Sequence, residues 1–173
     1  MHAKAHRIRR ICVATCAAPL LVLTGAAAAG AGTATQPVAS QPTASEAVQQ
    51  ASASEILALV NAERQKADCP ALTVNAKLTQ AAETHAADMA KNNLTSHTGS
   101  DGSNEETRLE RVGYNWRSWS ENVSGPGYAT SQDHVNGWLG SAAHKKAMLN
   151  CSFTETGVGV SGDRAVQLFA IPA

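Results

Sequence analysis

The sequence predicts an α+β domain in which helices come first and pack on a small, mainly antiparallel sheet. Apolar residues recur at steps of three and four over 56–63 and 78–89, as on the buried face of an amphipathic helix. The C-terminal end changes to a period of two, which predicts strands at 156–160 and 165–169. Helices followed by paired strands indicate helices layered against a sheet.

Capping residues mark the first two helices. Ser52 and Glu55 have the spacing of a capping box, which predicts a helix that begins there and ends before Pro70. Asn75 can cap the second helix, which carries the 78–89 stripe and closes near 91–93. A Gly- and Ser-rich loop is expected to follow.

Shorter elements are expected in the second half of the domain. Gly113 suits the left-handed position after a third helix, and Ser141 can cap a fifth. Helices are expected at about 104–112, 131–139 and 142–149, with a hairpin turn at 161–164 between the two strands.

The N-terminal segment predicts export. Residues 1–30 combine basic residues, an apolar run at 17–24 and small residues at 25–29, the pattern of a cleavable signal peptide. The apolar run is shorter than the roughly 20 residues that span a membrane, so no transmembrane helix is expected in the mature protein. Cys16 precedes this run, which argues against a lipid anchor. We expect a flexible Ala/Ser/Thr/Gln/Pro linker at 31–52 and the folded domain at 53–173.

The charge of the mature chain argues against nucleic acid as a partner. The full chain has 14 basic and 14 acidic residues. The first 30 residues contain four of the basic and none of the acidic ones, which leaves 10 and 14. A mildly acidic domain without a basic patch lacks the electrostatic footprint of nucleic-acid binding.

Two cysteines remain after removal of the signal peptide. Export places Cys69 and Cys151 in an oxidising compartment, so a disulfide between them is the default expectation. It would close a loop of about 80 residues, for which chain entropy gives up to about 4 kcal/mol of stabilisation. A metal thiolate site is the alternative, but no Cys-x-x-Cys spacing supports it.

Histidines are the candidates for chemistry. His97 lies in the polar loop and His144 in the first turn of a capped helix, whereas His85 falls on an apolar stripe and is interpreted as structural. His134 is expected to be exposed. Imidazole and carboxylate groups such as Glu121 can bind zinc or a related metal. Sequence spacing alone does not bring these residues together.

A series of short motifs covers about 54–170 and resembles the bacterial CAP superfamily (cysteine-rich secretory protein, or SCP-like, domains). In order they are LVNAER at 59–64, the stripe at 78–89, SH at 96–97, SEN at 120–122, the segment 138–144, FTETGVG at 153–159 and QLF at 167–169.

The resemblance implies an α-β-α sandwich with a shallow cleft of two histidines and two glutamates that can hold a divalent metal. Matched by motif, the metal ligands are His97 and His144, and Glu121 is the cleft glutamate. The position of the second glutamate, three residues after the helix tryptophan, is Ser141 here. The resemblance therefore implies a reduced triad that binds metal, zinc first, more weakly than the full set.

Three functions follow from these observations. The first is a secreted, non-catalytic module that binds a lipid, glycan or protein through the cleft. Trp116, Trp119 and Trp138 could line an apolar groove for it, or fill the core, which is the favoured interpretation for Trp138. The second is a metal-dependent hydrolase, which is disfavoured because the triad leaves no separate base. The third is a structural protein associated with the cell envelope.

Overall fold

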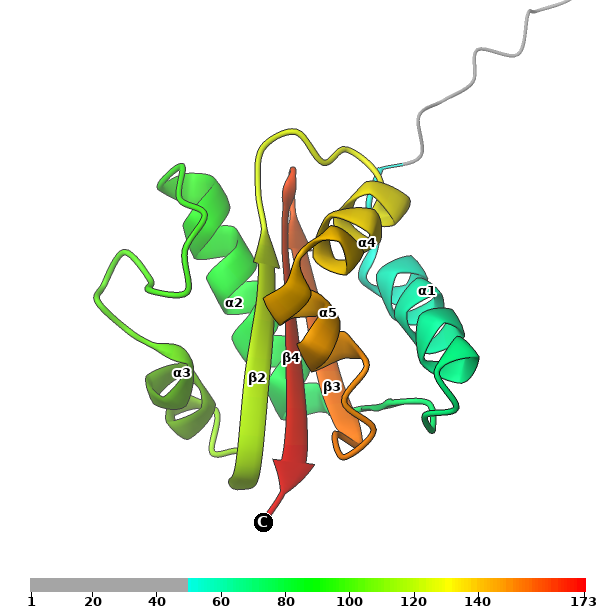
Figure 1. Cartoon of the computed structure of the whole chain (residues 1–173). Coiled ribbons are helices and arrows are strands. Elements are labelled where there is room, and N and C mark those ends of the chain that lie inside the picture. The colour runs from blue at the N-terminus through cyan, green and yellow to red at the C-terminus, as the bar shows by residue number, and fades with distance from the viewer. Residues whose placement is uncertain (1–49) are drawn as a thin grey trace, which may run out of the picture. The chain divides into compact units, whose positions relative to one another are not determined.

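The computed structural model describes residues 50–173, which form a sandwich of helices and strands (Figure 1). The expected signal peptide at 1–30 and most of the linker at 31–52 lie outside the described residues. No described helix is long and apolar enough to cross a membrane. The helices are α1 (Ala53–Lys66), α2 (Ala76–Lys91), α3 (Glu105–Arg111), α4 (Ser131–Gly140) and α5 (Ala142–Met148).

A four-stranded sheet in the order β1-β3-β4-β2 forms the middle layer. The strands are β1 (Thr73–Val74), β2 (Trp116–Ser124), β3 (Glu155–Ser161) and β4 (Arg164–Pro172). β4 pairs antiparallel with both β2 and β3, whereas the short β1 pairs parallel with β3. The fold class predicted from the sequence is thus confirmed, and the two C-terminal strands form the expected hairpin.

Two strands are not predicted from the sequence. β1 has only two residues, too few to show a period. β2 mixes tryptophans with polar residues, and four consecutive residues at its end, Glu121–Ser124, are buried. A strand whose polar residues are buried on both faces lacks the apolar–polar alternation from which strands are inferred.

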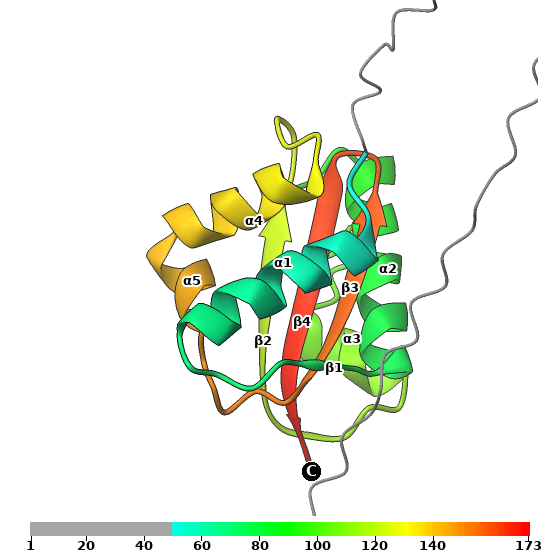
Figure 2. The same cartoon turned by 90° about the vertical axis from the view of Figure 1, so that its right-hand side faces the viewer.

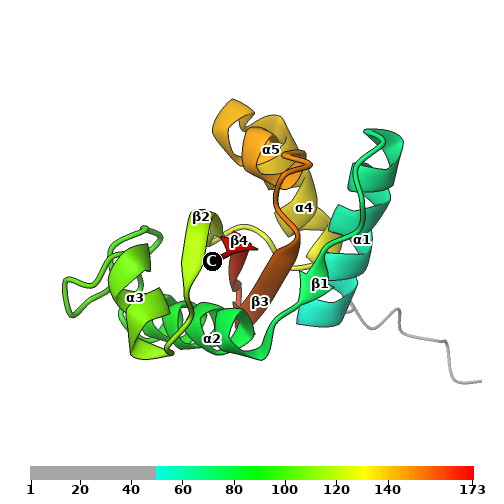
Figure 3. The same ribbon diagram turned by 90° about the horizontal axis from the view of Figure 1, so that it is seen from below.

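Helices cover both faces of the sheet. Figure 3 shows α2 and α3 on one side and α1, α4 and α5 on the other. In Figure 2, α1 runs in front of β3 and β4. Each face has its own apolar core, one centred on Ile56, Trp138 and Phe169 and the other on Leu78 and Leu168.

The N-caps predicted for α1 and α2 are present, but the reciprocal half of the capping box is not, because the Glu55 carboxylate accepts from the Ser131 hydroxyl instead. The Ser52 hydroxyl accepts from the backbone N–H of Glu55, and the Asn75 side chain accepts from that of Lys77. Ser141 occupies the N-cap position of α5, but its side chain makes no capping hydrogen bond. Gly113 has a φ of 65°, in the left-handed region expected after the third helix.

The junction of α1 with the chain after α5 is held by a disulfide and a buried arginine. Cys69 and Cys151 form the expected disulfide, with their Cα atoms 4.9 Å apart. Arg64 is fully buried and donates to the carbonyl oxygens of Pro70, Met148, Asn150 and Phe153 at 2.8–3.0 Å. The guanidinium thereby satisfies backbone groups that the turn leaves without partners.

Helix α2 lies directly on the backbone of β3. A Cβ atom added to Gly157 would overlap the backbone of Leu78 and Thr79, and one added to Gly159 would overlap that of Ala82 and Glu83. The two glycines alternate with the buried Val158, so the face of β3 that contacts the helix has no side chains at these two positions.

We predict that Gly157→Ala lowers the free energy of unfolding by about 3 kcal/mol or more, because helix and strand must separate. Urea denaturation measures this. The matched control is Gly140→Ala, since a Cβ at Gly140 meets no atom within 4 Å. Equal stability of both variants would show that α2 is not held at this distance by the glycines.

Candidate functional site

The candidate site lies at the open edge of the sheet. β2 is an edge strand, and Glu121 pairs on its inner side with Leu168 of β4. The loop between α2 and α3 brings His97 to this strand from one layer, and α5 brings His144 from the other. Residues that are far apart in sequence therefore meet where the sheet ends.

The position of His97 is fixed through the backbone of the preceding residue, Ser96, which forms a hydrogen bond with His85. His85, on the buried stripe of α2, places its Nε2 2.8 Å from the carbonyl oxygen of Ser96. Because a carbonyl only accepts, Nε2 carries the proton, and burial lowers the pKa of His85 so that the ring stays neutral. The structural role expected for His85 is thus confirmed, and it fixes the loop that carries His97.

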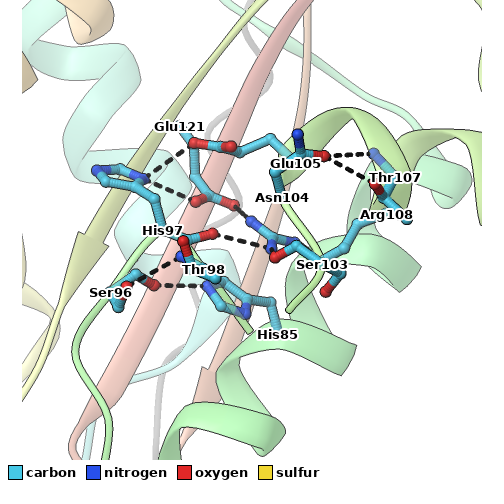
Figure 4. Close-up of polar contacts among 10 residues, drawn as sticks. All are labelled: His85, Ser96, His97, Thr98, Ser103, Asn104, Glu105, Thr107, Arg108 and Glu121. Atoms are coloured by element: carbon cyan, nitrogen blue, oxygen red, sulfur yellow. Dashed lines mark hydrogen bonds and ion pairs between the residues drawn. The ribbon is translucent and has the colours of Figure 1, made fainter. Parts of the chain in front are cut away.

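Two glutamates meet at one ring nitrogen of His97 (Figure 4). The Nδ1 atom lies 2.9 Å from Oε1 of Glu121 and 3.2 Å from Oε1 of Glu105. The side chain of Glu121 is fully buried and that of Glu105 is 15% exposed, whereas that of His97 is 46% exposed. One potential ligand atom from each of the three residues lies within 4.8 Å of the others, close enough to share a metal ion.

A buried arginine completes the network (Figure 4). Arg108 of α3 donates from Nη2 to Oε2 of Glu121 at 2.8 Å. Its Nη1 donates to the carbonyl oxygens of His97 at 3.0 Å and Ser103 at 3.2 Å. The two carboxylates of the site thus face two cationic groups, Arg108 and protonated His97.

The paired carboxylates shift the pKa values of the site. Hydrogen bonds that the imidazolium donates to Glu105 and Glu121 raise the pKa of His97 to about 9, against the effect of burial. Burial raises the pKa of Glu105, but its bonds to His97 and to its own backbone N–H outweigh this and leave the pKa below its usual value. Burial and the nearby His97 lower the pKa of His144.

The ring of His144 lies near that of His97, with the ring centroids 6.4 Å apart. Its carbonyl oxygen accepts from the buried side chain of Asn122, which connects α5 to β2. His144 is outside the group of three with mutually close ligand atoms, so its role as a metal ligand stays a prediction.

A hollow of about 410 Å³ adjoins His144. Its wall contains Pro126, Tyr128 and Trp138, and its polar lining includes Ser124 and Ser141. The Tyr128 ring lies against the bare backbone of Gly137, at a distance that leaves no room for a Cβ. His144 therefore lies both near His97 and at a hollow whose wall includes Tyr128 and Trp138.

The structure adds a glutamate that the sequence does not reveal. Ser141 stands where the motif expects the second cleft glutamate, which predicted a reduced set. Glu105, in the first turn of α3, instead lies beside His97 and Glu121. A first-turn glutamate also suits a helix N-terminus on general grounds, so nothing in the sequence singled out Glu105.

The expectation that His134 is exposed was wrong. The side chain is fully buried, Nδ1 lies 2.7 Å from Oγ of Ser124, and the ring packs beside Tyr128 and Trp138. Tyr128 belongs to the loop before α4, and the helical pattern of α4 alone does not show that this loop returns to cover the ring.

The tryptophans do not form an apolar groove together, and the core position favoured for Trp138 is confirmed. Trp138 is buried in the core and donates from Nε1 to the carbonyl oxygen of Val123. Trp116 and Trp119 are partly buried against the opposite core, so only Trp138 reaches the pocket.

We predict that His97 titrates with a pKa of about 9 in the metal-free protein, measured by NMR of the imidazole protons. Because this value exceeds the ordinary 6.5, the imidazolium stabilises the fold fully below pH 6.5 and this stability is lost as the pH rises through 9. Glu105→Gln should lower the pKa of His97, and Glu106→Gln, on the exposed side of α3, should not. A pKa near 6.5 in the native protein would refute the pairing.

Comparison with known proteins identifies similar chains in bacteria. A family model described as the cysteine-rich secretory protein family matches residues 57–170. The membrane protein YlbC of Bacillus subtilis is 31% identical over 138 residues, which is 80% of this chain and 40% of the relative. YkwD of the same organism is 30% identical over 61% of this chain and 40% of its own length. The chain thus spans about 40% of the curated relatives that it matches.

Solved structures agree with this result. An extracellular protein of Bacillus anthracis that contains an SCP domain has a TM-score of 0.65 at 30% identity, covering 68% of this chain and 39% of that one. An outer surface protein of Borrelia burgdorferi has a TM-score of 0.62 at 21% identity, covering 68% of this chain and 90% of that one, and supports the fold alone.

The family match spans nearly all of the described sandwich, and the motifs that carry it place His97 and Glu121 at the same sheet edge. On this evidence the chain belongs to the CAP superfamily of cysteine-rich secretory proteins.

Proposed function

We propose that this domain is a secreted, non-catalytic binding module that holds a divalent metal in its cleft and presents it to a ligand. The observation that carries the proposal is the close grouping of His97, Glu105 and Glu121, whose ligand atoms lie within 4.8 Å of one another. One imidazole and two carboxylates are a donor set that suits zinc. The exposed side of His97 leaves the site open to solvent, so a bound metal could accept an oxygen atom of a ligand.

The adjoining pocket favours a lipid as the ligand. Its aromatic and apolar wall, formed by Pro126, Tyr128 and Trp138, suits an acyl chain, and His144 lies at its border with the cleft. A volume of about 410 Å³ is within the range of small-molecule sites. A fatty carboxylate could therefore place its tail in the pocket and its head toward the metal.

Two features of the chain support the proposal that it is secreted. The expected signal peptide precedes the domain, and the Cys69–Cys151 disulfide is typical of an oxidising compartment. The similar Bacillus anthracis protein is described as extracellular, although YlbC is named a membrane protein. Association with the cell envelope is compatible with both descriptions.

A metal-dependent hydrolase is the second candidate, and Glu105 is the observation that favours it. A catalytic zinc needs protein ligands, an open position and a nearby base. With two glutamates at the site, one can bind the metal while the other accepts a proton from water. Zinc-dependent turnover of ester or peptide substrates, lost in Glu105→Gln, would replace the binding module with this function.

We predict that zinc binds the protein with one-to-one stoichiometry and raises its melting temperature. His97→Ala and His144→Ala should each weaken binding by about tenfold or more while leaving the fold intact, since neither side chain is fully buried. Titration calorimetry on these variants, with Glu106→Gln as the control, measures this. Unchanged zinc affinity in both histidine variants would rule out the metal cleft.

We predict that oleate binds the zinc-loaded protein and quenches or shifts the fluorescence of Trp138. Gly137→Leu should abolish oleate binding but not zinc binding, because the new side chain displaces the Tyr128 ring into the pocket. Gly140→Leu on the same helix is the control, since a Cβ there meets no neighbouring atom. Zinc binding without an oleate response would reject the lipid, and neither response would favour a structural role in the envelope.

A further inference from the structure

The charge beside the cleft comes from a residue that is not a metal ligand. Glu121 has no exposed side-chain surface, and the guanidinium of Arg108, whose side chain is 5% exposed, lies 2.8 Å from its Oε2 atom. A buried carboxylate requires a compensating charge, because burial removes the water that would otherwise solvate it. In the metal-free protein Arg108 is that charge.

The guanidinium is fixed by backbone groups and not only by Glu121. Its Nη1 atom donates to the carbonyl oxygens of His97 at 3.0 Å and Ser103 at 3.2 Å. These acceptors do not depend on whether a metal is present. Arg108 therefore has reason to stay beside Glu121 when a cation enters the cleft.

We infer that Arg108 is an internal cation that sets the metal affinity of the cleft and keeps it low. This inference rests on the proposed function, since it concerns the affinity of the same site. Arg108 occupies Oε2 of Glu121, which leaves to a metal only Oε1, the oxygen that bonds to Nδ1 of His97 in the metal-free protein. Arg108 also acts electrostatically, because a fixed positive charge in contact with Glu121 repels an incoming divalent cation.

The sign of the effect follows from the charges. Removal of the guanidinium makes the potential at the cleft more negative. A divalent ion gains twice as much from this change as a single proton held at the same place, so metal binding benefits even where the two compete. At the separations of this network one unit charge corresponds to about tenfold or more in affinity.

Arg111 offers a matched control on the same helix. It carries the same charge three residues further along α3, but its pair with Asp101 is exposed, with side chains 55% and 52% accessible. Solvent screens such a pair, so its effect on the cleft should be small. Arg108→Gln and Arg111→Gln thus remove the same charge from a buried and an exposed position.

The experiment is a zinc titration by calorimetry of the wild type and both variants at one pH and ionic strength. Arg108→Gln should bind zinc at least about tenfold more tightly than the wild type, and Arg111→Gln within about threefold of it. Arg108→Lys keeps the charge but not the planar guanidinium, and its zinc affinity should stay nearer to that of the wild type than the affinity of Arg108→Gln does.

Thermal unfolding with and without zinc covers the case in which Arg108→Gln does not fold alone. The inference expects zinc to replace the missing charge, so the rise in melting temperature should be larger for Arg108→Gln than for the wild type or Arg111→Gln. A variant that stays unfolded in saturating zinc would overturn the inference.

The outcomes separate this inference from the proposed function. If the wild type binds zinc and Arg108→Gln binds it equally or more weakly, Arg108 does not limit affinity and only the inference fails. An equal gain in both glutamine variants would also overturn it, because the effect would then be general. If none of the proteins binds zinc, the metal cleft itself fails and the inference fails with it.

Discussion

The close packing of α2 against the backbone of β3 is the constraint on which the rest of the site depends. Gly157 and Gly159 let the helix approach until backbone meets backbone, and the helix then fixes the loop that follows it. His85, in the second half of α2, holds the carbonyl of Ser96, and His97 is the next residue. The position of His97 at the sheet edge is thus set by two glycines on a strand in the middle of the sheet.

Two of the buried arginines of the described domain, Arg64 and Arg108, hold irregular backbone in place. Arg64 collects four carbonyl oxygens where α1 meets the chain after α5, close in sequence to Cys69 of the disulfide. Arg108 collects two carbonyl oxygens and one carboxylate between α3 and β2. In both cases a planar donor satisfies irregular backbone that no helix or sheet can satisfy, and it orients the segment at the same time. Of the two, Arg108 also faces an ionised partner, which makes it part of the chemistry of the cleft.

The positive and negative charges of the site balance one another without a metal. Protonated His97 and Arg108 face Glu105 and Glu121, so two positive groups compensate two negative ones. A metal that enters must displace the proton of His97 and accept Arg108 as a neighbour. Under the proposed function, a ligand that adds an oxygen donor would therefore contribute to the stability of the metal complex. A site of this kind is suited to reversible binding.

The sequence by itself determined the elements whose signals are local. Caps and periodicity indicated α1, α2 and the β3–β4 hairpin, and predicted export with two remaining cysteines indicated the disulfide. Motif resemblance led to His97 and Glu121. Only the tertiary structure decided that Glu105 and Arg108 join them, and that His134 is buried. The physical reason is that a charged residue in a short helix has the same local pattern whether it faces solvent or a cleft, and the difference arises from segments distant in the chain.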